Sequence, residues 1–305
     1  MGDRIHINEV GPRDGLQNQP VNLTVEEKLE LVGELVGAGI TAIEATSFVS
    51  PKAVPQMADA DQLFPRLPKA DRVAYSALVP NVRGLERALL AGVREIAVVL
   101  AATDTMNLRN IKMSLAQAKQ ACIDTIVEAA TRGLRKKAYV AVAFTCPFEG
   151  KVDPDRVLDL AGEMFLHGAD EVVIADTIGA ANPREVSELL PECVRRFGAA
   201  RLSVHFHDTR GFALANAWAA HSAGVRRFDS SVGGLGGCPF VPGAAGNLAT
   251  EDLVVLAEQC GFRTGIDLPR LRRAVAVAER LTRRKLGGRT TAWLQSEDTR
   301  GGPRE

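Results

Sequence analysis

Two histidines separated by one residue are the strongest chemical signal in this sequence. His205 and His207 belong to the run RLSVHFHD, whose alternation of apolar and polar residues is typical of a β-strand. Residues i and i+2 of a strand point to the same face, so the two imidazoles project together and can chelate one cation. A single histidine beside an apolar strand is more often a satisfied core residue, but a pair at a strand end favours a metal site.

Polar side chains at other predicted strand ends extend this site. Arg13 and Asp14 follow the first strand in EVGPRDGLQNQ, Glu44 lies within the second, and Cys238 and Asn247 follow the last. Two imidazoles, one carboxylate and an optional amide oxygen are ligands of mixed hardness. They suit an octahedral Mg²⁺, Mn²⁺ or Co²⁺ with open positions for substrate better than a closed tetrahedral zinc site.

Other carboxylates and histidines are weaker candidates for this site. Asp176 and Asp208 are alternative carboxylates, but Asp208 alternates to the face opposite the histidine pair, which is typical of a supporting or capping group. His6 has no nearby partner in the sequence, and His167 and His221 lie near predicted helix ends, where a capping role is the ordinary interpretation.

Cys238 stands in a glycine-rich segment, GGLGGCPFVPGAAGN, that has the composition of a ligand-binding loop. The glycines are not a dinucleotide fingerprint, because that motif opens a helix after the first strand of a βαβ unit. Flexibility or a close approach of two backbones is the safer interpretation.

Short apolar runs alternate with stretches of helical period from residue 5 to residue 261. The predicted strands cover 5–10, 41–47, 72–79, 95–102, 137–145, 171–177, 201–208 and 227–232. Each strand is followed by a helix candidate, and examples are 25–38, 82–91, 115–131, 156–166, 184–197, 214–223 and 251–259. Recurrent Ala-Gly and His-Gly pairs supply left-handed caps at helix ends. Eight βα units without a linker favour the α/β class and a (β/α)8 TIM barrel with additional C-terminal helices, whose chemistry lies at the carboxyl ends of the strands.

The barrel is expected to span residues 5–270, and the remaining 271–305 to form a C-terminal helix and a flexible tail. A helix is predicted around 268–281, and the last dozen residues are expected to be poorly ordered. The basic run Arg283, Arg284 and Lys285 is interpreted as a solvated helix end.

Composition limits the partners and the compartment. The 305 residues carry 37 basic and 37 acidic side chains, so no overall field attracts nucleic acid or a membrane surface. No apolar run reaches the roughly 18 residues that span a bilayer, and the first residues do not resemble a signal peptide. Five cysteines without a C-x-x-C pair suit reduced thiols, and all except Cys238 are expected to act as buried apolar residues. We therefore expect a cytoplasmic protein with a small-molecule substrate.

Several strings carry a family resemblance: GPRDGLQNQ, IEATSFVSPKAVPQM, CPFEG, DTIG, HFHDTRG, and GGLGGCPF with GNLATED. From about residue 5 to residue 270 the chain resembles the 3-hydroxy-3-methylglutaryl-CoA (HMG-CoA) lyases, which are TIM-barrel members of the metal-dependent lyase and Claisen-condensing superfamily. The resemblance implies cleavage of HMG-CoA to acetyl-CoA and acetoacetate with Mg²⁺ or Mn²⁺, in leucine degradation. It also implies an acyl-CoA substrate and a homo-oligomer, a dimer or larger.

The resemblance also assigns residues to roles. It places the metal on Asp14, His205, His207 and Asn247, and so fixes the amide that spacing alone leaves open. Catalytic positions fall on Arg13, Glu44 and Cys238, and His205 shares the base role with Glu44 as an alternative. Tyr139 and Asp176 match polar positions of the family site and are expected, with Arg13, to contact substrate.

The chain departs from the family pattern in two segments. Its loop contains CPFVPGAAGN where the family varies around CPYAPGASGN, and ATDTMNLRNIKMS after the fourth strand is divergent. These segments could contact the acyl chain, so a lyase for a longer substrate such as an isohexenylglutaryl-CoA is an alternative. A condensing synthase of the same superfamily, an H-x-H hydrolase and a non-catalytic metal-binding barrel are further alternatives.

Overall fold

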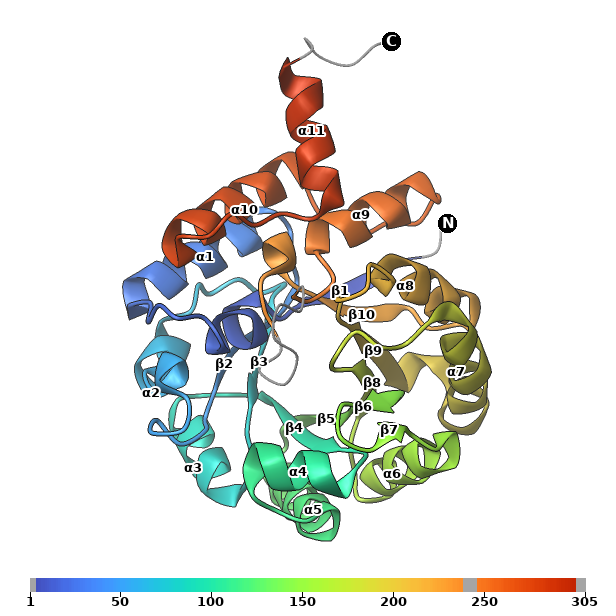
Figure 1. The fold of residues 1–305 in the computed structure, drawn as a ribbon. Helices are drawn as coiled ribbons and strands as arrows, with labels where there is room; N and C mark the ends of the chain where they lie inside the picture. Colours follow the sequence, from blue (N-terminus) through green and yellow to red (C-terminus); the bar gives the residue numbers. More distant parts are fainter. Residues whose placement is uncertain (1–3, 238–245, 300–305) are drawn as a thin grey trace.

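The protein folds as a closed parallel β-barrel surrounded by helices (Figure 1). The computed structural model describes residues 4–237 and 246–299. Neighbouring strands around the barrel follow the order β1-β10-β9-β8-β5-β4-β3-β2, which confirms the predicted TIM barrel. These strands are β1 (His6–Glu9), β2 (Ala42–Ser47), β3 (Ala74–Leu78), β4 (Glu95–Ala101), β5 (Arg135–Ala141), β8 (Glu171–Asp176), β9 (Leu202–Phe206) and β10 (Arg227–Ser230).

Helices cover the outer face of the barrel and bury their apolar sides against it. They are α1 (Val25–Gly37), α2 (Ala60–Leu63), α3 (Val82–Leu90), α4 (Asp104–Ile111), α5 (Leu115–Thr131), α6 (Pro154–Leu166), α7 (Pro183–Phe197), α8 (Ala213–Ser222), α9 (Thr250–Gln259) and α10 (Leu268–Thr282). A last helix, α11 (Arg289–Thr299), lies outside this layer. Short helical turns are η2 (Pro55–Met57), η3 (Phe64–Arg66), η4 (Ala199–Arg201) and η5 (Val232–Gly234).

Local sequence signals explain where the helices start and stop. Thr24, Ser114 and Asn182 form capping boxes at the starts of α1, α5 and α7. The predicted glycine caps are confirmed, because the glycines of the Ala-Gly and His-Gly pairs have positive φ angles: Gly39, Gly92, Gly168 and Gly224. The large apolar core between strands and helices follows from these periodicities.

Two irregular segments at the carboxyl ends of strands were not predicted. A single turn of π-helix, η1 (Gly11–Gly15), follows β1 and carries Arg13 and Asp14. The fifth strand ends earlier than expected, because Val142 has a φ of 49°, which a strand does not accommodate. The chain beyond it forms a separate two-stranded hairpin of β6 (Thr145–Cys146) and β7 (Gly150–Lys151).

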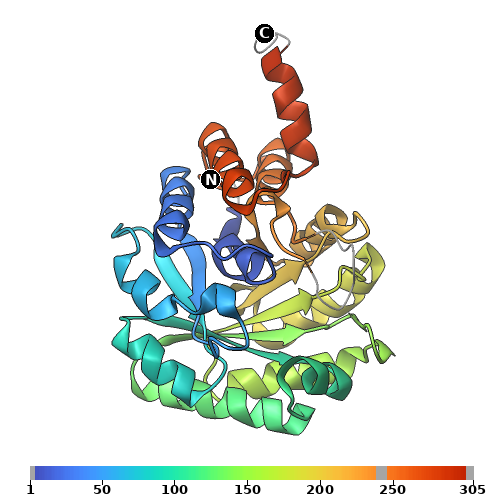
Figure 2. The same cartoon turned by 60° about the vertical axis from the view of Figure 1, so that its left-hand side comes forward.

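The C-terminal segment differs in part from its prediction. Helix α10 packs against α1, where Arg270 Nη1 donates to Gly37 O over 3.0 Å and Asp267 N donates to Ala38 O over 2.8 Å. Residues 289–299 form a further helix, α11, which was not predicted, and Figures 1 and 2 show it projecting away from the barrel. The run 283–285 is exposed at the end of α10, as predicted.

Within the described part of the chain, no helix combines the length and the apolar character that crossing a membrane requires.

Candidate metal and catalytic site

Asp14, His205 and His207 come together at the carboxyl end of the barrel. Their ligand atoms all lie within 4.8 Å of one another, and the histidine ring centroids are 5.1 Å apart. Asp14 comes from the turn after β1, while the two histidines lie at the end of β9, so the barrel closure joins parts of the chain nearly 200 residues apart. The arrangement offers two imidazoles and one carboxylate to a metal ion.

The charge states of Asp14 and His207 suit a cation. Burial opposes ionisation of Asp14, but Arg13 and both histidines outweigh it and lower its pKa to about 2. Burial and the neighbouring His205 lower the pKa of His207 to about 4. Near neutral pH, Asp14 is therefore a carboxylate and His207 a neutral imidazole, the forms that bind metals.

Asn247 completes this group of side chains. Its Nδ2 donates to Asp14 Oδ2 over 3.0 Å and to Leu235 O over 3.1 Å. Its Oδ1 is buried and has no hydrogen-bond partner among the described residues. His207 Nδ1 also lacks a partner among these residues. A buried oxygen without a donor is costly, and a cation beside Asp14 would satisfy it.

Arg13 and Glu44 form a buried ion pair next to Asp14. Arg13 Nε donates to Glu44 Oε1, and Arg13 Nη1 donates to Asp14 Oδ1 over 2.7 Å. Arg13 is 7% exposed and Glu44 is fully buried. A guanidinium fixed by two carboxylates at a barrel mouth can stabilise negative charge that develops on a substrate.

Tyr139 links Glu44 to a carboxylate that the sequence interpretation missed. The Tyr139 hydroxyl donates to Asp229 Oδ2 over 2.8 Å and lies 3.2 Å from Glu44 Oε2. Asp229 also lies 3.1 Å from His205 Nδ1. One feature of the sequence could have revealed it: Asp229 is an acidic residue within the short predicted strand RFDSSV.

Glu9 was also missed, and it joins the first and last loops of the site. Its Oε1 accepts the backbone N–H of Gly11 over 2.8 Å and of Val232 over 2.9 Å, and its Oε2 accepts the Thr250 hydroxyl over 2.6 Å. This one carboxylate thereby holds the turn that carries Arg13 and Asp14 against the loop that leads to Asn247.

The two alternative carboxylates have supporting roles in the described structure. Asp176 accepts the backbone N–H groups of Ala180 and Ala181 over 2.9 and 3.0 Å, and burial raises its pKa to about 6. Asp208 accepts the N–H of Ala213 over 3.0 Å at the start of α8, which is the capping role predicted for it.

The glycines of the last loop serve a close approach of two backbones. A Cβ on Gly246 would collide with Gly234 O, and a Cβ on Gly236, whose φ is 152°, would lie 2.6 Å from Asn247 Nδ2. Larger residues at these positions would displace Asn247. Cys238 lies outside the described residues.

The other cysteines and histidines do not contribute to the site. Cys122, Cys146 and Cys193 are buried as predicted, but the prediction for Cys260 is wrong because it is exposed after α9. His167 Nδ1 lies 2.8 Å from Glu163 O at the end of α6, the expected helix-end position. His6 is exposed on β1.

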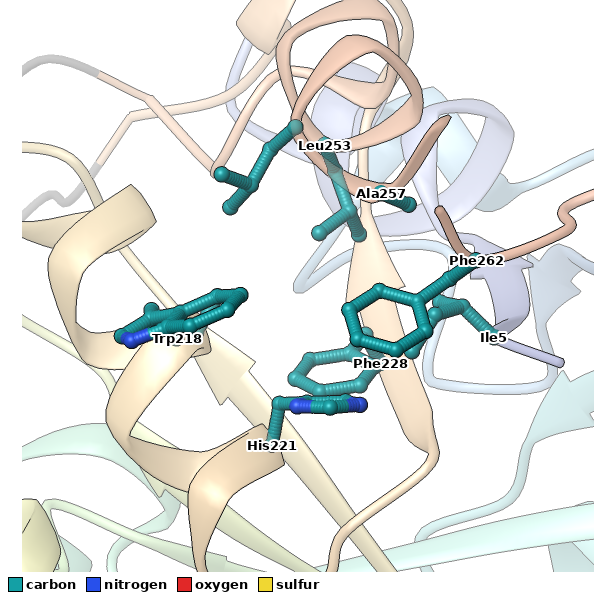
Figure 3. A pocket seen from close by; sticks show the side chains of 9 residues that line it. Ile5, Trp218, His221, Phe228, Leu253, Ala257 and Phe262 are labelled. Atoms are coloured by element: carbon teal, nitrogen blue, oxygen red, sulfur yellow. The ribbon is translucent and has the colours of Figure 1, made fainter. Parts of the chain in front are cut away.

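A separate apolar pocket lies between α8 and α9. Figure 3 shows Trp218, His221 and Phe262 around it, and the His221 and Phe262 ring centroids are 4.2 Å apart. Ile5 and Phe228 line its base, so it lies near the amino ends of β1 and β10. Because barrel chemistry occurs at the carboxyl ends, this pocket is not the candidate site.

Comparisons with known proteins show which proteins this chain resembles. A profile of the HMGL-like family matches residues 4–277. The chain is 46% identical over 264 residues to the hydroxymethylglutaryl-CoA lyase of Pseudomonas mevalonii, covering 87% of this chain and 88% of that protein. It is 41% identical over 265 residues to the 3-hydroxy-3-isohexenylglutaryl-CoA/hydroxy-methylglutaryl-CoA lyase of Pseudomonas aeruginosa, covering 87% and 88%. The solved HMG-CoA lyase of Bacillus subtilis superposes with a TM-score of 0.93 at 40% identity, covering 96% and 98%.

Proposed function

This chain belongs to the HMGL-like family, and from that membership we propose that it cleaves 3-hydroxy-3-methylglutaryl-CoA to acetyl-CoA and acetoacetate. The observation that carries the proposal is the cluster of Asp14, His205 and His207 beside the Arg13–Glu44 ion pair. A retro-Claisen cleavage needs a polarised hydroxyl, a base, and a cation near the developing enolate, and this end of the barrel offers groups for each.

The side chains fit a divalent cation. Asp14, His205, His207 and Asn247 would hold it, and the unpartnered Asn247 Oδ1 supports the inclusion of the amide. We propose Mg²⁺ or Mn²⁺, because carboxylate, amide and imidazole ligands with open positions suit these ions. A bound cation would acidify the C3 hydroxyl of the substrate and fix its orientation.

Arg13 is proposed to stabilise the enolate. Cleavage of the C2–C3 bond leaves an electron pair on C2, which delocalises onto the thioester oxygen. Arg13 Nε and Nη1 are held by Glu44 and Asp14, and Nη2 has no hydrogen bond to the described residues. The Nη2 donors are thereby positioned to bind that oxygen in a site where water does not compete.

Glu44 is proposed as the group that accepts the hydroxyl proton. His205 is the alternative, but its Nδ1 faces Asp229, and its other nitrogen would be a metal ligand. Glu44 Oε1 is held by Arg13, while the one hydrogen-bonding contact of Oε2 within the described part of the chain is with Tyr139, at 3.2 Å. We propose that Tyr139 and Asp176 border the substrate, as the resemblance implies.

Cys238 is proposed as the acid that protonates the acetyl-CoA carbanion. A thiol near a cationic group exchanges protons close to neutral pH. The family resemblance supports this role, and the described residues 237 and 246 border the loop that contains it.

The main alternative is a lyase of the same type that prefers a longer acyl chain, such as isohexenylglutaryl-CoA. A relative 41% identical is named for both isohexenylglutaryl-CoA and HMG-CoA, and α4, which follows β4, lies in the divergent segment. A condensing synthase has less support, because the named relatives are lyases.

One assay tests the proposed activity. The purified protein is incubated with Mg²⁺ or Mn²⁺ and HMG-CoA, and acetoacetate and acetyl-CoA are quantified. Formation of both products in equal amounts is expected. The isohexenyl substrate is run in parallel, and the larger kcat/KM identifies the preferred acyl chain. Absence of cleavage of either substrate by folded, metal-loaded protein would overturn the proposal.

We further propose leucine degradation as the pathway, a cytoplasmic location and a homo-oligomer. These rest on the family resemblance and the neutral composition. Light scattering after size exclusion measures the oligomeric state, and growth of a deletion strain on leucine tests the pathway.

A further inference from the structure

Asn8, Asp229 and His205 occupy one row across three neighbouring strands. In the parallel register, Asn8 of β1 is level with Asp229 of β10, and Asp229 is level with His205 of β9. Level residues of parallel strands point to the same side of the sheet, here into the barrel. Asp229 therefore lies directly beside His205, beneath the carboxyl-end cluster.

The contacts of Asp229 define what its carboxylate can do. Asn8 Nδ2 donates to its Oδ1 over 2.8 Å, and the Tyr139 hydroxyl donates to its Oδ2 over 2.8 Å. Asp229 is 2% exposed, so these groups, rather than water, hold it in place. A carboxylate that receives two such donors acts as an acceptor toward its third neighbour.

That third neighbour is His205 Nδ1, which lies 3.1 Å from Asp229 Oδ2. An acceptor facing a ring nitrogen requires that this nitrogen carry the proton. In a neutral imidazole the other nitrogen, Nε2, then has the free lone pair. We propose that Asp229 is a positioning residue that fixes His205 as the Nδ1-protonated tautomer and thereby presents Nε2 to the cation site.

This inference rests on the metal site of the proposed function, but not on the substrate. Metal-binding histidines commonly donate their second N–H to a carboxylate, which orients the ring and raises its basicity as a ligand. Tyr139 and Asn8 act one step further away, because they fix the carboxylate.

The first test uses metal-free protein. Two-dimensional ¹⁵N–¹H spectra of the histidine rings, recorded where the imidazoles are neutral, report which nitrogen carries the proton. We expect Nδ1–H at His205 in the wild type, and a shift toward Nε2–H in Asp229→Ala. Nε2–H in the wild-type protein would overturn the proposal without any variant.

The second test measures Mn²⁺ binding by titration calorimetry or by paramagnetic resonance. Asp229→Ala is expected to weaken Mn²⁺ binding by roughly 10- to 100-fold. Asp229→Asn keeps the shape but has only one acceptor oxygen, and its amide nitrogen can donate to His205 Nδ1, so it should also favour the Nε2–H tautomer and weaken Mn²⁺ binding with little loss of packing. Folded Asp229→Ala protein with wild-type tautomer and affinity would contradict the role.

Glu171→Gln is the matched control. Glu171 is another buried barrel carboxylate, with Ser203 and Lys137 as partners at the opposite end of the strands. Its loss should lower stability and leave Mn²⁺ affinity unchanged. If Glu171→Gln weakened Mn²⁺ binding as much as Asp229→Ala does, the effect at Asp229 would reflect a general disturbance of the barrel, and the proposal would be rejected. Neither measurement uses acyl-CoA. If the tautomer and the Mn²⁺ affinities are as expected but the protein does not cleave HMG-CoA, the proposed function is rejected and the role of Asp229 stands.

Discussion

Asn247 donates its side-chain amide to Asp14 Oδ2 over 3.0 Å, joining residues that are 233 positions apart in the chain. This bond connects the turn after the first barrel strand to the loop after the last one. The same amide leaves Oδ1 buried without a donor among the described residues. Asn247 thus orients the carboxylate and offers an oxygen beside it, which is how a metal site can be assembled when the barrel closes.

Asp14→Asn is expected to abolish metal-dependent cleavage while the barrel stays folded. The amide keeps the shape of the side chain but loses the charge that neutralises a cation. Mn²⁺ affinity should fall by at least roughly 100-fold, because even the loss of an outer partner of a ligand costs up to that much. Calorimetry measures the affinity, and circular dichroism checks the fold.

Asp208→Ala is the control for Asp14→Asn. Asp208 follows His207 but caps α8, so its loss should lower the free energy of unfolding by about 1 kcal/mol and spare Mn²⁺ binding. Unchanged metal affinity in Asp14→Asn, or a loss of fold in that variant, would contradict the assignment of Asp14.

Cys238→Ser is expected to lower kcat by roughly 100-fold or more, because a hydroxyl is a far weaker acid than a thiol. Metal affinity should be unchanged, since Cys238 is not among the proposed ligands. Turnover of HMG-CoA measures the effect, and Cys260→Ser, which alters an exposed cysteine after α9, is the matched control. Near wild-type turnover in Cys238→Ser would leave the thiol without a chemical role.

Arg13→Lys is expected to lower kcat by roughly 100- to 1,000-fold with a smaller change in KM. Lysine keeps the positive charge but cannot hold Glu44 and Asp14 through separate nitrogens while it presents a further donor. Steady-state kinetics separates the two parameters. Arg87→Lys, at an ion pair with Asp61 on the outer face, should leave both unchanged. If KM instead rose by a comparable factor and kcat stayed at the wild-type value, Arg13 would be assigned to binding of the substrate in the ground state.

The sequence predicted the barrel because its strands and helices carry strong periodicity, and because H-x-H has a fixed geometrical meaning on a strand. It could not predict Asp229 or Glu9, since a single acidic residue in a short strand does not reveal what lies level with it across a barrel. Those contacts depend on register: Asp229 is level with His205 only once β9 and β10 pair. The π-helical turn at Gly11–Gly15 was missed for a similar reason, because its shape depends on the Glu9 bond to Gly11 N.

Glu9 should make stability fall as pH rises. Burial raises the pKa of Glu9 from 4.5 to about 7, although Thr250, Val232 and Gly11 donate to its carboxylate. Between these two pH values the folded state holds a proton that the unfolded state has released. The contribution of Glu9 to stability is therefore complete below pH 4.5 and lost as pH rises through about 7. The difference corresponds to about 3 kcal/mol.

Glu9→Gln should flatten this part of the pH profile of unfolding. The amide oxygen can accept from Gly11 and Val232, while the amide nitrogen donates to Thr250, whose hydroxyl then turns to Ser230, 2.8 Å away. The variant keeps every contact and removes the titrating proton, so at pH above 7 it should be more stable than the wild type. Urea unfolding of both proteins across this range measures the difference. Parallel profiles would show that Glu9 titrates near its ordinary value in the folded protein, and that its three donors outweigh its burial.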